Sequence, residues 1–270
     1  MEALPPVTDV PRRTPPFAWR QAGGWTILAQ PDWAGAIAEA LASKTTLDKD
    51  AAGSWDTHAR GGRGPVQRFE GPDGPAILRP TRRGGLLGGI QGDRFVTVNR
   101  PLWELRIHCH AYTQDLPLPE PIGAYWRRTT GLLQGGFISR EASGAIPLHM
   151  ALQQGAGPEL CRAAGVRIRQ MHDAGVWHAD LNAGNILVTA RGPMLIDFDK
   201  AQVRFPLGGL ARSRNLLRLE RSWRKWRLPA EGFVAILDGY GAIRIPGWLQ
   251  WLYDLRSASF RRNFNEERRS

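Results

Sequence analysis

The segment from His172 to Asp199 constrains the fold more than any other part of this chain of 270 residues. It begins His-Asp-Ala-Gly-Val-Trp-His-Ala-Asp-Leu-Asn-Ala-Gly-Asn-Ile-Leu-Val and ends Met-Leu-Ile-Asp-Phe-Asp. Two short apolar runs, residues 186–189 and 194–196, stand on either side of a Gly-Pro turn and predict a β-hairpin. Such a hairpin would fix Asn185 at its start and Asp197 at its end.

The polar residues of this segment are those that phosphoryl transfer requires. One carboxylate orients a hydroxyl group, and an amide with a second carboxylate holds magnesium. His178, Asp180 and Asn185 have the spacing His-x-Asp-x-x-x-x-Asn of a kinase catalytic loop, and Ile-Asp-Phe follows around Asp197. We therefore predict Asp180 as the catalytic residue and Asn185 and Asp197 as magnesium ligands. His178 is predicted to be structural, tying the loop to the metal-binding turn.

A glycine-containing strand–turn–strand pattern occurs in the first third of the chain. Arg60-Gly-Gly-Arg-Gly-Pro-Val66 runs into a strand-like segment, and a second strand, Pro75 to Arg79, follows the turn at residues 71–74. In kinases, bare backbone at such a tip approaches the nucleotide phosphates. Gly62 and Gly64 are therefore predicted to cover the nucleotide, although glycine-rich hairpins without a ligand are common.

A cation and a carboxylate occupy the positions of a kinase ion pair. Ala76-Ile-Leu-Arg79 matches the strand motif Val-Ala-Ile-Lys, with arginine in place of the lysine that contacts phosphates. Residues 101–112 have helical periodicity with a proline in the first turn, and Glu104 lies on that predicted helix. Arg79, held by Glu104, is predicted to bind nucleotide phosphates; the alternative for Glu104 is an ordinary surface carboxylate.

The remaining patterns predict an α+β protein. Strands are expected at residues 25–29 and 136–141, and helices at 158–174 and 213–227. These elements fit a protein-kinase-like fold with two lobes, a small β-rich N-lobe and a reduced, mainly helical C-lobe. We expect a flexible lead-in at 1–16, an N-lobe at 17–140 and a C-lobe at 141–270.

Composition indicates a cytosolic protein with a strongly basic end. The chain has no apolar run long enough to cross a bilayer, no evident secretory signal, and two cysteines without a disulfide or metal spacing. Of its net charge of +11, the larger part lies in residues 201–270, which hold 14 Lys and Arg against 6 Asp and Glu. Such a surface attracts nucleic acid or anionic lipid head groups. Four tryptophans lie among those arginines: Trp223, Trp226, Trp248 and Trp251.

Two interpretations of this basic segment remain open. Indole rings favour the membrane–water interface, so the segment could sit on lipid. Alternatively, solvated arginines could surround a packed tryptophan core. No nucleic-acid recognition motif accompanies the charge, which argues against a nucleic-acid partner.

The segment 171–188 and Leu195-Ile-Asp-Phe-Asp-Lys resemble the lipopolysaccharide core kinase family, most closely its kinases for 3-deoxy-D-manno-octulosonic acid (Kdo). Residues 78–86, 99–104 and 116–121 are similar to its N-lobe segments. The resemblance implies ATP and Mg²⁺, and transfer of the γ-phosphate to the Kdo 4-hydroxyl on a lipid A precursor. It also implies work at the cytoplasmic face of a Gram-negative inner membrane, where we expect a peripheral position. We infer no obligate protein partner.

Departures from protein kinases agree with this resemblance. Ala179 replaces the arginine that clamps a phosphorylated activation loop, Asn182 stands at a lysine position, and Asp199 replaces the glycine of Asp-Phe-Gly. The open alternatives are a heptose kinase of the same family, a reduced protein kinase, and a non-catalytic pseudokinase scaffold.

Overall fold

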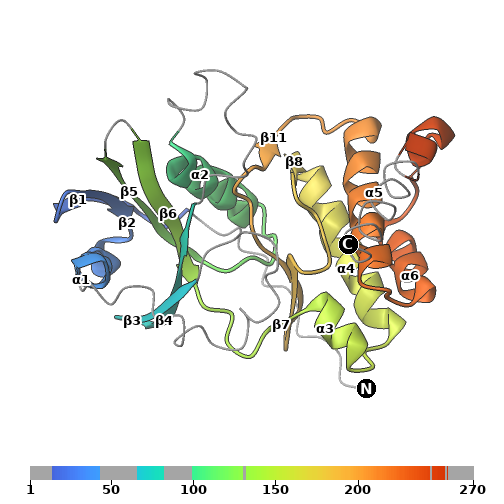
Figure 1. The fold of residues 1–270 in the computed structure, drawn as a ribbon, viewed down its shortest axis with the longest axis horizontal. Helices are drawn as coiled ribbons and strands as arrows, with labels where there is room; N and C mark the ends of the chain where they lie inside the picture. Colours follow the sequence, from blue (N-terminus) through green and yellow to red (C-terminus); the bar gives the residue numbers. More distant parts are fainter. Residues whose placement is uncertain are drawn as a thin grey trace, which may run out of the picture. The chain divides into compact units, whose positions relative to one another are not determined.

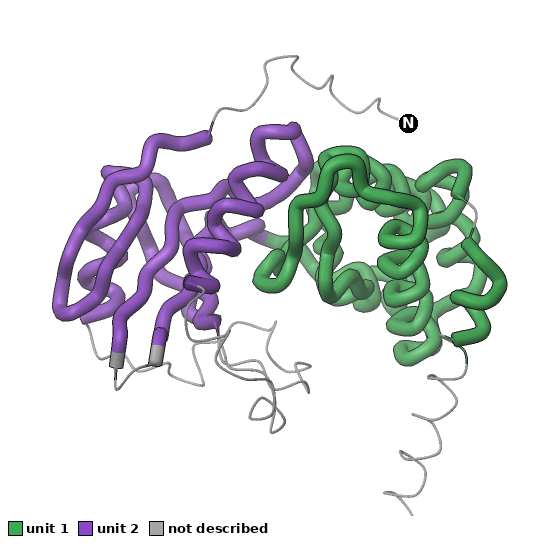
Figure 2. The backbone as a smooth tube through the Cα atoms, turned by 90° about the horizontal axis from the view of Figure 1, so that it is seen from above, with its two compact units in different colours: residues 1–4, 144–270 green, residues 5–143 purple. Residues whose placement is uncertain are grey.

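The computed structural model describes residues 14–42, 66–81, 99–129, 132–243, 245–252 and 254. The chain divides into two compact units, residues 5–143 and residues 144–270 with 1–4 (Figure 2). Each unit buries its own set of apolar side chains. Gly62 and Gly64, predicted to cover the nucleotide, lie outside the described residues.

The unit 5–143 is built on an antiparallel sheet (Figure 1). Among the described residues the sheet has six strands in the order β1-β2-β5-β6-β4-β3. The tight β3–β4 turn needs Gly74, whose φ of +115° is unfavourable for residues with a side chain. The strands are β1 (Ala18–Ala22), β2 (Trp25–Ala29), β3 (Gln67–Gly71), β4 (Gly74–Pro80), β5 (Pro121–Thr129) and β6 (Leu132–Arg140).

Both faces of this sheet are covered, because side chains alternate along each strand. On one face Ile27, Leu78 and Tyr125 pack with Trp33 and Ile37 of η1 (Pro31–Trp33) and α1 (Ala34–Ala42). The other face carries α2 (Arg100–Thr113), whose Leu105 and Cys109 pack against Ala124 and Phe137 (Figure 1). The side chain of Asn99 caps α2 by accepting a hydrogen bond from the amide of Leu102.

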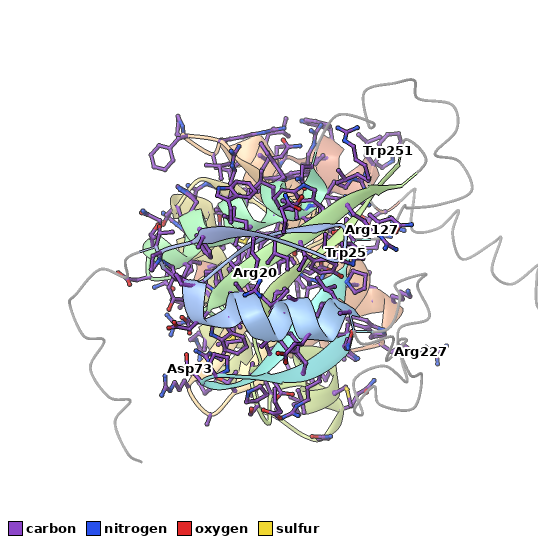
Figure 3. The ribbon with its side chains drawn as sticks, turned by 90° about the vertical axis from the view of Figure 1, so that its left-hand side faces the viewer. Arg20, Trp25, Asp73, Arg127, Arg227 and Trp251 are labelled. Carbon is purple, nitrogen blue, oxygen red and sulfur yellow. The ribbon has the colours of Figure 1, made fainter. Side chains whose placement is uncertain are left out.

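A cation–π contact ties two neighbouring strands of the sheet together. The guanidinium of Arg127 on β5 lies 4.2 Å from the ring centroid of Trp25 on β2 (Figure 3). Such contacts stabilise exposed sites by about 0.5–1 kcal/mol. This one helps to hold the β2–β5 pairing near its end.

The unit 144–270 is mainly helical, with short strands that carry the loops between the helices (Figure 1). Its described strands pair as β10-β9-β7 and β11-β8. The elements are β7 (Ile146–Pro147), α3 (Leu148–Gln153), α4 (Pro158–Asp173), β8 (Val176–Trp177), β9 (Ile186–Thr189), β10 (Gly192–Leu195), β11 (Gln202–Val203), α5 (Gly209–Lys225) and α6 (Ala230–Tyr240).

Helices α4 and α6 approach closely at two glycines. A Cβ at Gly165 would lie 2.0 Å from the carbonyl oxygen of Ile236, and one at Gly239 would lie 1.9 Å from that of Arg162. Neither distance is compatible with a side chain, so the absence of Cβ atoms sets the spacing of this helix pair.

The predicted α+β class is confirmed, and most predicted elements are found. Helices 101–112 and 158–174 correspond to α2 and α4, and the predicted hairpin corresponds to β9 and β10. The helix predicted at 213–227 begins earlier, at Gly209. Helices α3 and α6 were not predicted. Across the described part of the chain, no helix combines the length and apolar character that a membrane span requires.

Candidate active site

The loop between β8 and β9 holds Asp180 and Asn185 in a hydrogen-bonded frame. The side-chain amides of Asn182 and Asn185 both donate to the carbonyl oxygen of Asp180, at 2.9 and 2.8 Å. The oxygen Oδ1 of Asn182 accepts from the amide of Gly184 at 2.9 Å, which closes a tight turn. The conformation of the loop is therefore fixed by hydrogen bonds from its own asparagine side chains, between residues close in sequence.

The hairpin β9–β10 brings Asp197 back to this loop, as predicted. Ile186 pairs with Leu195, so the residues just outside the hairpin face each other. The amide of Ile196 donates to the carbonyl oxygen of Asn185 at 3.0 Å. Asp197 itself has φ of +72°, which is uncommon for a residue with a side chain and is typical of functional turns.

His178 joins the loop to the turn, which confirms its predicted structural role. Its Nδ1 accepts a hydrogen bond from the amide of Asp180 at 3.1 Å. Its Nε2 lies 2.9 Å from the carbonyl oxygen of Ile196, beside Asp197. Because Nδ1 accepts, Nε2 carries the proton and donates, which assigns one neutral tautomer. The ring is fully buried, so it braces the site without facing solvent.

A buried asparagine on α5 supports His178 from behind. The Oδ1 of Asn215 accepts from the amide of His178 at 3.0 Å, and its Nδ2 donates to the carbonyl oxygen of His178 at 2.8 Å. The same Oδ1 lies 3.1 Å from Nε2 of His172, whose Nδ1 lies 2.9 Å from the hydroxyl of Tyr240. Burial lowers the pKa of His172 to about 4, so this ring is neutral at pH 7. The sequence analysis missed Asn215, because no local motif marks it.

The carboxylate of Asp180 is partly open to solvent, with 41% of its side chain exposed. The guanidinium of Arg218 on α5 lies near it, with Nη1 3.9 Å from Oδ1 of Asp180. This distance is longer than a hydrogen bond, so the guanidinium stands beside the carboxylate without docking on it. Arg218 was also missed, since it lies far along the chain in a helix rich in arginine.

The second group of predicted residues lies in the unit 5–143. Arg79 on β4 and Glu104 on α2 form an ion pair through Nη2 and Oε1, which confirms the predicted contact. Glu104 is only 2% exposed, and the guanidinium of Arg79 also lies 5.8 Å from the ring centroid of Phe137. A buried carboxylate in this position fixes the arginine and offsets its charge. The alternative of a surface glutamate is wrong.

A neutral histidine lies one turn beyond Glu104 on α2. His108 is buried, and its Nε2 lies 2.6 Å from the carbonyl oxygen of Pro119. Burial, and to a smaller extent the charge of Arg79, lowers the pKa of His108 to about 4. The ring is therefore uncharged at pH 7 and adds no positive charge beside the Arg79–Glu104 pair.

The donor groups present suit a magnesium ion that is shared with phosphates. The side-chain nitrogen Nδ2 of Asn185 donates to the carbonyl oxygen of Asp180. The amide oxygen Oδ1 of Asn185 therefore points away from that carbonyl. Within the described residues no three His, Cys, Asp or Glu side chains gather as a metal site. Mg²⁺ in phosphoryl transfer needs only one or two protein carboxylates, because substrate phosphates and water complete its shell. An amide oxygen and the Asp197 carboxylate fit that requirement.

Comparisons with known proteins show which family the chain is similar to. Three bacterial proteins named 3-deoxy-D-manno-octulosonic acid kinase are similar to the chain. The one from Stenotrophomonas maltophilia (strain K279a) is 36% identical over 183 residues, covering 64% of this chain and 73% of the relative. The one from Xylella fastidiosa (strain M12) is 33% identical over 174 residues, covering 63% and 70%. The one from Xanthomonas euvesicatoria pv. vesicatoria (strain 85-10) is 36% identical over 185 residues, covering 64% and 73%.

A solved structure, described as WaaP in complex with acyl carrier protein, has a similar fold. It matches with a TM-score of 0.52 at 16% identity and covers 72% of this chain and 84% of that one. At this identity the likeness concerns the fold alone. The family described as lipopolysaccharide kinase (Kdo/WaaP) matches residues 59–240, a range that includes both predicted groups of site residues. The chain therefore belongs to the lipopolysaccharide kinase (Kdo/WaaP) family.

Proposed function

We propose that this protein is an ATP-dependent Kdo kinase, which transfers the γ-phosphate of ATP to the 4-hydroxyl of Kdo on a lipid A precursor in lipopolysaccharide core biosynthesis. The observation that carries the proposal is the frame of Asp180, Asn185 and Asp197 in a member of this family. Relatives named Kdo kinase, at 33–36% identity, supply the acceptor. Membership of a kinase family implies ATP as the phosphoryl donor.

Asp180 is proposed to orient the acceptor hydroxyl and to take its proton. The hydroxyl oxygen forms a bond to the γ-phosphorus as the bond from that phosphorus to the β,γ-bridging oxygen breaks, which leaves ADP. The carboxylate of Asp180 is partly exposed, so an acceptor can reach it. The backbone carbonyl of Asp180 is held by the side-chain amides of Asn182 and Asn185. Catalysis of this kind depends on position more than on covalent chemistry.

Asn185 and Asp197 are proposed to hold Mg²⁺. The bound ion would neutralise phosphate charge during transfer. The hydrogen bond from the amide of Ile196 to the carbonyl oxygen of Asn185 holds the two residues near each other. The imidazole of His178 links Ile196, beside Asp197, to the amide of Asp180. The hydrogen bonds of the loop and the turn thus hold the two proposed ligands in place before the ion binds.

Arg79 is proposed to contact the nucleotide phosphates, held in place by the buried carboxylate of Glu104. Backbone amides near Gly62 and Gly64 are proposed to cover the nucleotide. An arginine offers a planar fork to phosphate oxygens, whereas the lysine of other kinases offers one point charge. The replacement of lysine by arginine keeps a positive charge that can bind phosphate, so it does not favour a non-catalytic scaffold.

We further propose that the protein associates peripherally with the cytoplasmic face of the inner membrane through its C-terminal tryptophans. The four tail tryptophans divide into two classes. Trp223 is buried, and Trp226 stacks on His149 at 4.0 Å between ring centroids. Trp248 and Trp251 are 55% and 60% exposed, three residues apart, next to the exposed Leu252. Exposed indoles in a segment whose sequence is rich in arginine suit an anionic lipid surface.

One assay tests the proposed function against its alternatives. The protein would be incubated with ATP and Mg²⁺ and with Kdo–lipid A precursor, a heptose-containing acceptor, a generic protein substrate, or no acceptor. We expect turnover only with the Kdo acceptor, and a loss of about 10²–10⁴-fold in kcat for Asp180→Asn. Turnover of only the heptose acceptor or only the protein would contradict the proposal, and no turnover with any acceptor would favour a pseudokinase.

The membrane association is tested separately by vesicle co-sedimentation. We expect binding to vesicles that contain anionic lipid at low salt, weakening as salt screens the charges. Trp248→Ser with Trp251→Ser should reduce that binding, whereas Trp19→Ser, which alters an exposed tryptophan of the other unit, should not. Equal binding by both variants, or no binding by the parent protein, would contradict membrane association through these tryptophans.

A further inference from the structure

Helix α5 is attached to the catalytic loop at two points. Asn215 hydrogen-bonds to both main-chain groups of His178, at the start of the loop. Ser222 accepts a hydrogen bond through Oγ from the amide of Ala183 at 3.2 Å, further along the same loop. Residues three and four apart share a helix face, so Arg218 lies between these two attachments and on the same side of α5.

The two attachments fix the position of Arg218 relative to Asp180. They bracket the loop on either side of Asp180, and the guanidinium of Arg218 lies 3.9 Å from its carboxylate. Both side chains are about two-fifths exposed. A ligand that enters from solvent and places its hydroxyl on Asp180 would therefore also contact the guanidinium of Arg218.

Arg218 is part of a basic stripe along α5. Arg214, Arg218, Arg221 and Lys225 recur at helical spacing and share one face of the helix. Other α5 arginines are used differently: Arg212 pairs with Asp173, and Arg224 pairs with Glu220 and Asp254.

We propose that Arg218 binds the carboxylate of the sugar acid and so makes the enzyme specific for an acidic acceptor. The inference rests on the proposed function, in which the acceptor is an octulosonic acid with its 4-hydroxyl on Asp180. In such a sugar the carboxylate is attached to C2 and the acceptor hydroxyl to C4, so only three ring carbons join the two groups. A hydroxyl on Asp180 thus brings the carboxylate near the position of Arg218.

The charges explain why a cation is required there. An acceptor carboxylate close to the Asp180 carboxylate would be repelled, and the repulsion grows as water is excluded. The Arg218 guanidinium lies beside Asp180 and can offer two parallel N–H donors to the acceptor carboxylate. It would thereby favour the acidic sugar over a neutral sugar with the same hydroxyl.

Steady-state kinetics with two acceptors test this role. One acceptor is the Kdo–lipid A precursor, and the other is the same molecule with its C1 carboxylate converted to the amide. For Arg218→Gln we expect kcat/KM on the carboxylate acceptor to fall about 10- to 100-fold, the range for a charged hydrogen bond. The change should lie mainly in the KM for acceptor, with the KM for ATP unchanged. Arg218→Lys should recover part of the loss.

The amide acceptor separates recognition from catalysis. The parent protein should use it poorly, and Arg218→Gln should cause little further loss, because the partner of the guanidinium is already absent. Arg191→Gln, an exposed arginine of the β9–β10 turn, serves as the charge control and should leave both acceptors unaffected. Unfolding by urea should show that Arg218→Gln is folded.

Each outcome decides the matter. An equal loss on both acceptors would overturn the inference and assign Arg218 to the transferred phosphoryl group or to the placement of Asp180. Normal kinetics for Arg218→Gln would overturn the inference alone. No turnover of either acceptor by the parent protein would overturn the proposed function, and this inference with it.

Discussion

Asn215 satisfies both main-chain polar groups of His178, accepting from its amide at 3.0 Å and donating to its carbonyl at 2.8 Å. The contact joins the middle of α5 to the first residue of the loop between β8 and β9. Since His178 in turn holds Asp180 and Ile196, one buried amide supports both halves of the candidate site.

Replacing Asn215 should destabilise the protein and weaken catalysis. Asn215→Leu leaves buried polar groups of His178 and His172 without their partner, and each such group costs about 1–3 kcal/mol. We expect a loss of about 2–4 kcal/mol in the free energy of unfolding, measured by urea, with a lower kcat in the folded fraction. Ser222→Ala removes one attachment of the same helix and should cost only about 1 kcal/mol. Equal effects of the two variants would contradict a special role for Asn215.

Breaking the Arg79–Glu104 pair should affect ATP binding more than acceptor binding. Glu104→Gln removes the buried charge that holds Arg79, and losing one partner of a buried pair costs about 3–5 kcal/mol. Because Arg79 is partly exposed, we expect the lower part of that range in urea unfolding. The KM for ATP should rise several-fold, and the KM for acceptor should stay within about twofold. A rise confined to the acceptor KM would argue against nucleotide contact.

The close approach of α4 and α6 should not tolerate a methyl group at Gly165. The added Cβ of Gly165→Ala would overlap the carbonyl oxygen of Ile236, so the helices must separate. We expect a loss of about 1–3 kcal/mol in the free energy of unfolding. Gly209→Ala, at the start of α5 where a Cβ meets nothing within 4 Å, should be neutral or slightly stabilising. Thermal unfolding of the two variants compares the effects directly.

Stability should fall as the pH drops below about 6.5. The pKa values of His108 and His172 are lowered from 6.5 to about 4 in the folded protein, mainly by burial. Between these values the unfolded chain binds more protons than the folded one, so protonation favours unfolding. Each histidine should lower the free energy of unfolding by up to about 3 kcal/mol, with the full loss reached near pH 4. Urea unfolding at pH 7.5, 6.0 and 5.0 measures this slope.

A histidine variant provides the control for that slope. His108→Gln keeps a donor for the carbonyl oxygen of Pro119 but does not titrate, so the dependence on pH should become shallower. An unchanged slope in this variant would show that His108 titrates normally in the folded protein.

The loop that holds Asp180 and Asn185 and the turn at Asp197 could be predicted from the sequence because their structure is local. Asn182 and Asn185 hold the carbonyl of Asp180 within a few residues, and a hairpin returns Asp197 to the same place. The spacing of polar residues therefore carries the geometry. The Arg79–Glu104 contact was also predicted, through its match to a recurring strand and helix arrangement.

Tertiary packing alone decided what surrounds that site. Arg218 and Asn215 are distant from the loop in sequence, and only the docking of α5 places them at Asp180 and His178. The arginines of α5 look alike in the sequence, yet packing pairs Arg224 with carboxylates and places Arg218 by the site. Side-chain identity fixes which chemistry is available, whereas burial and long-range contacts determine which copies of a residue take part in it.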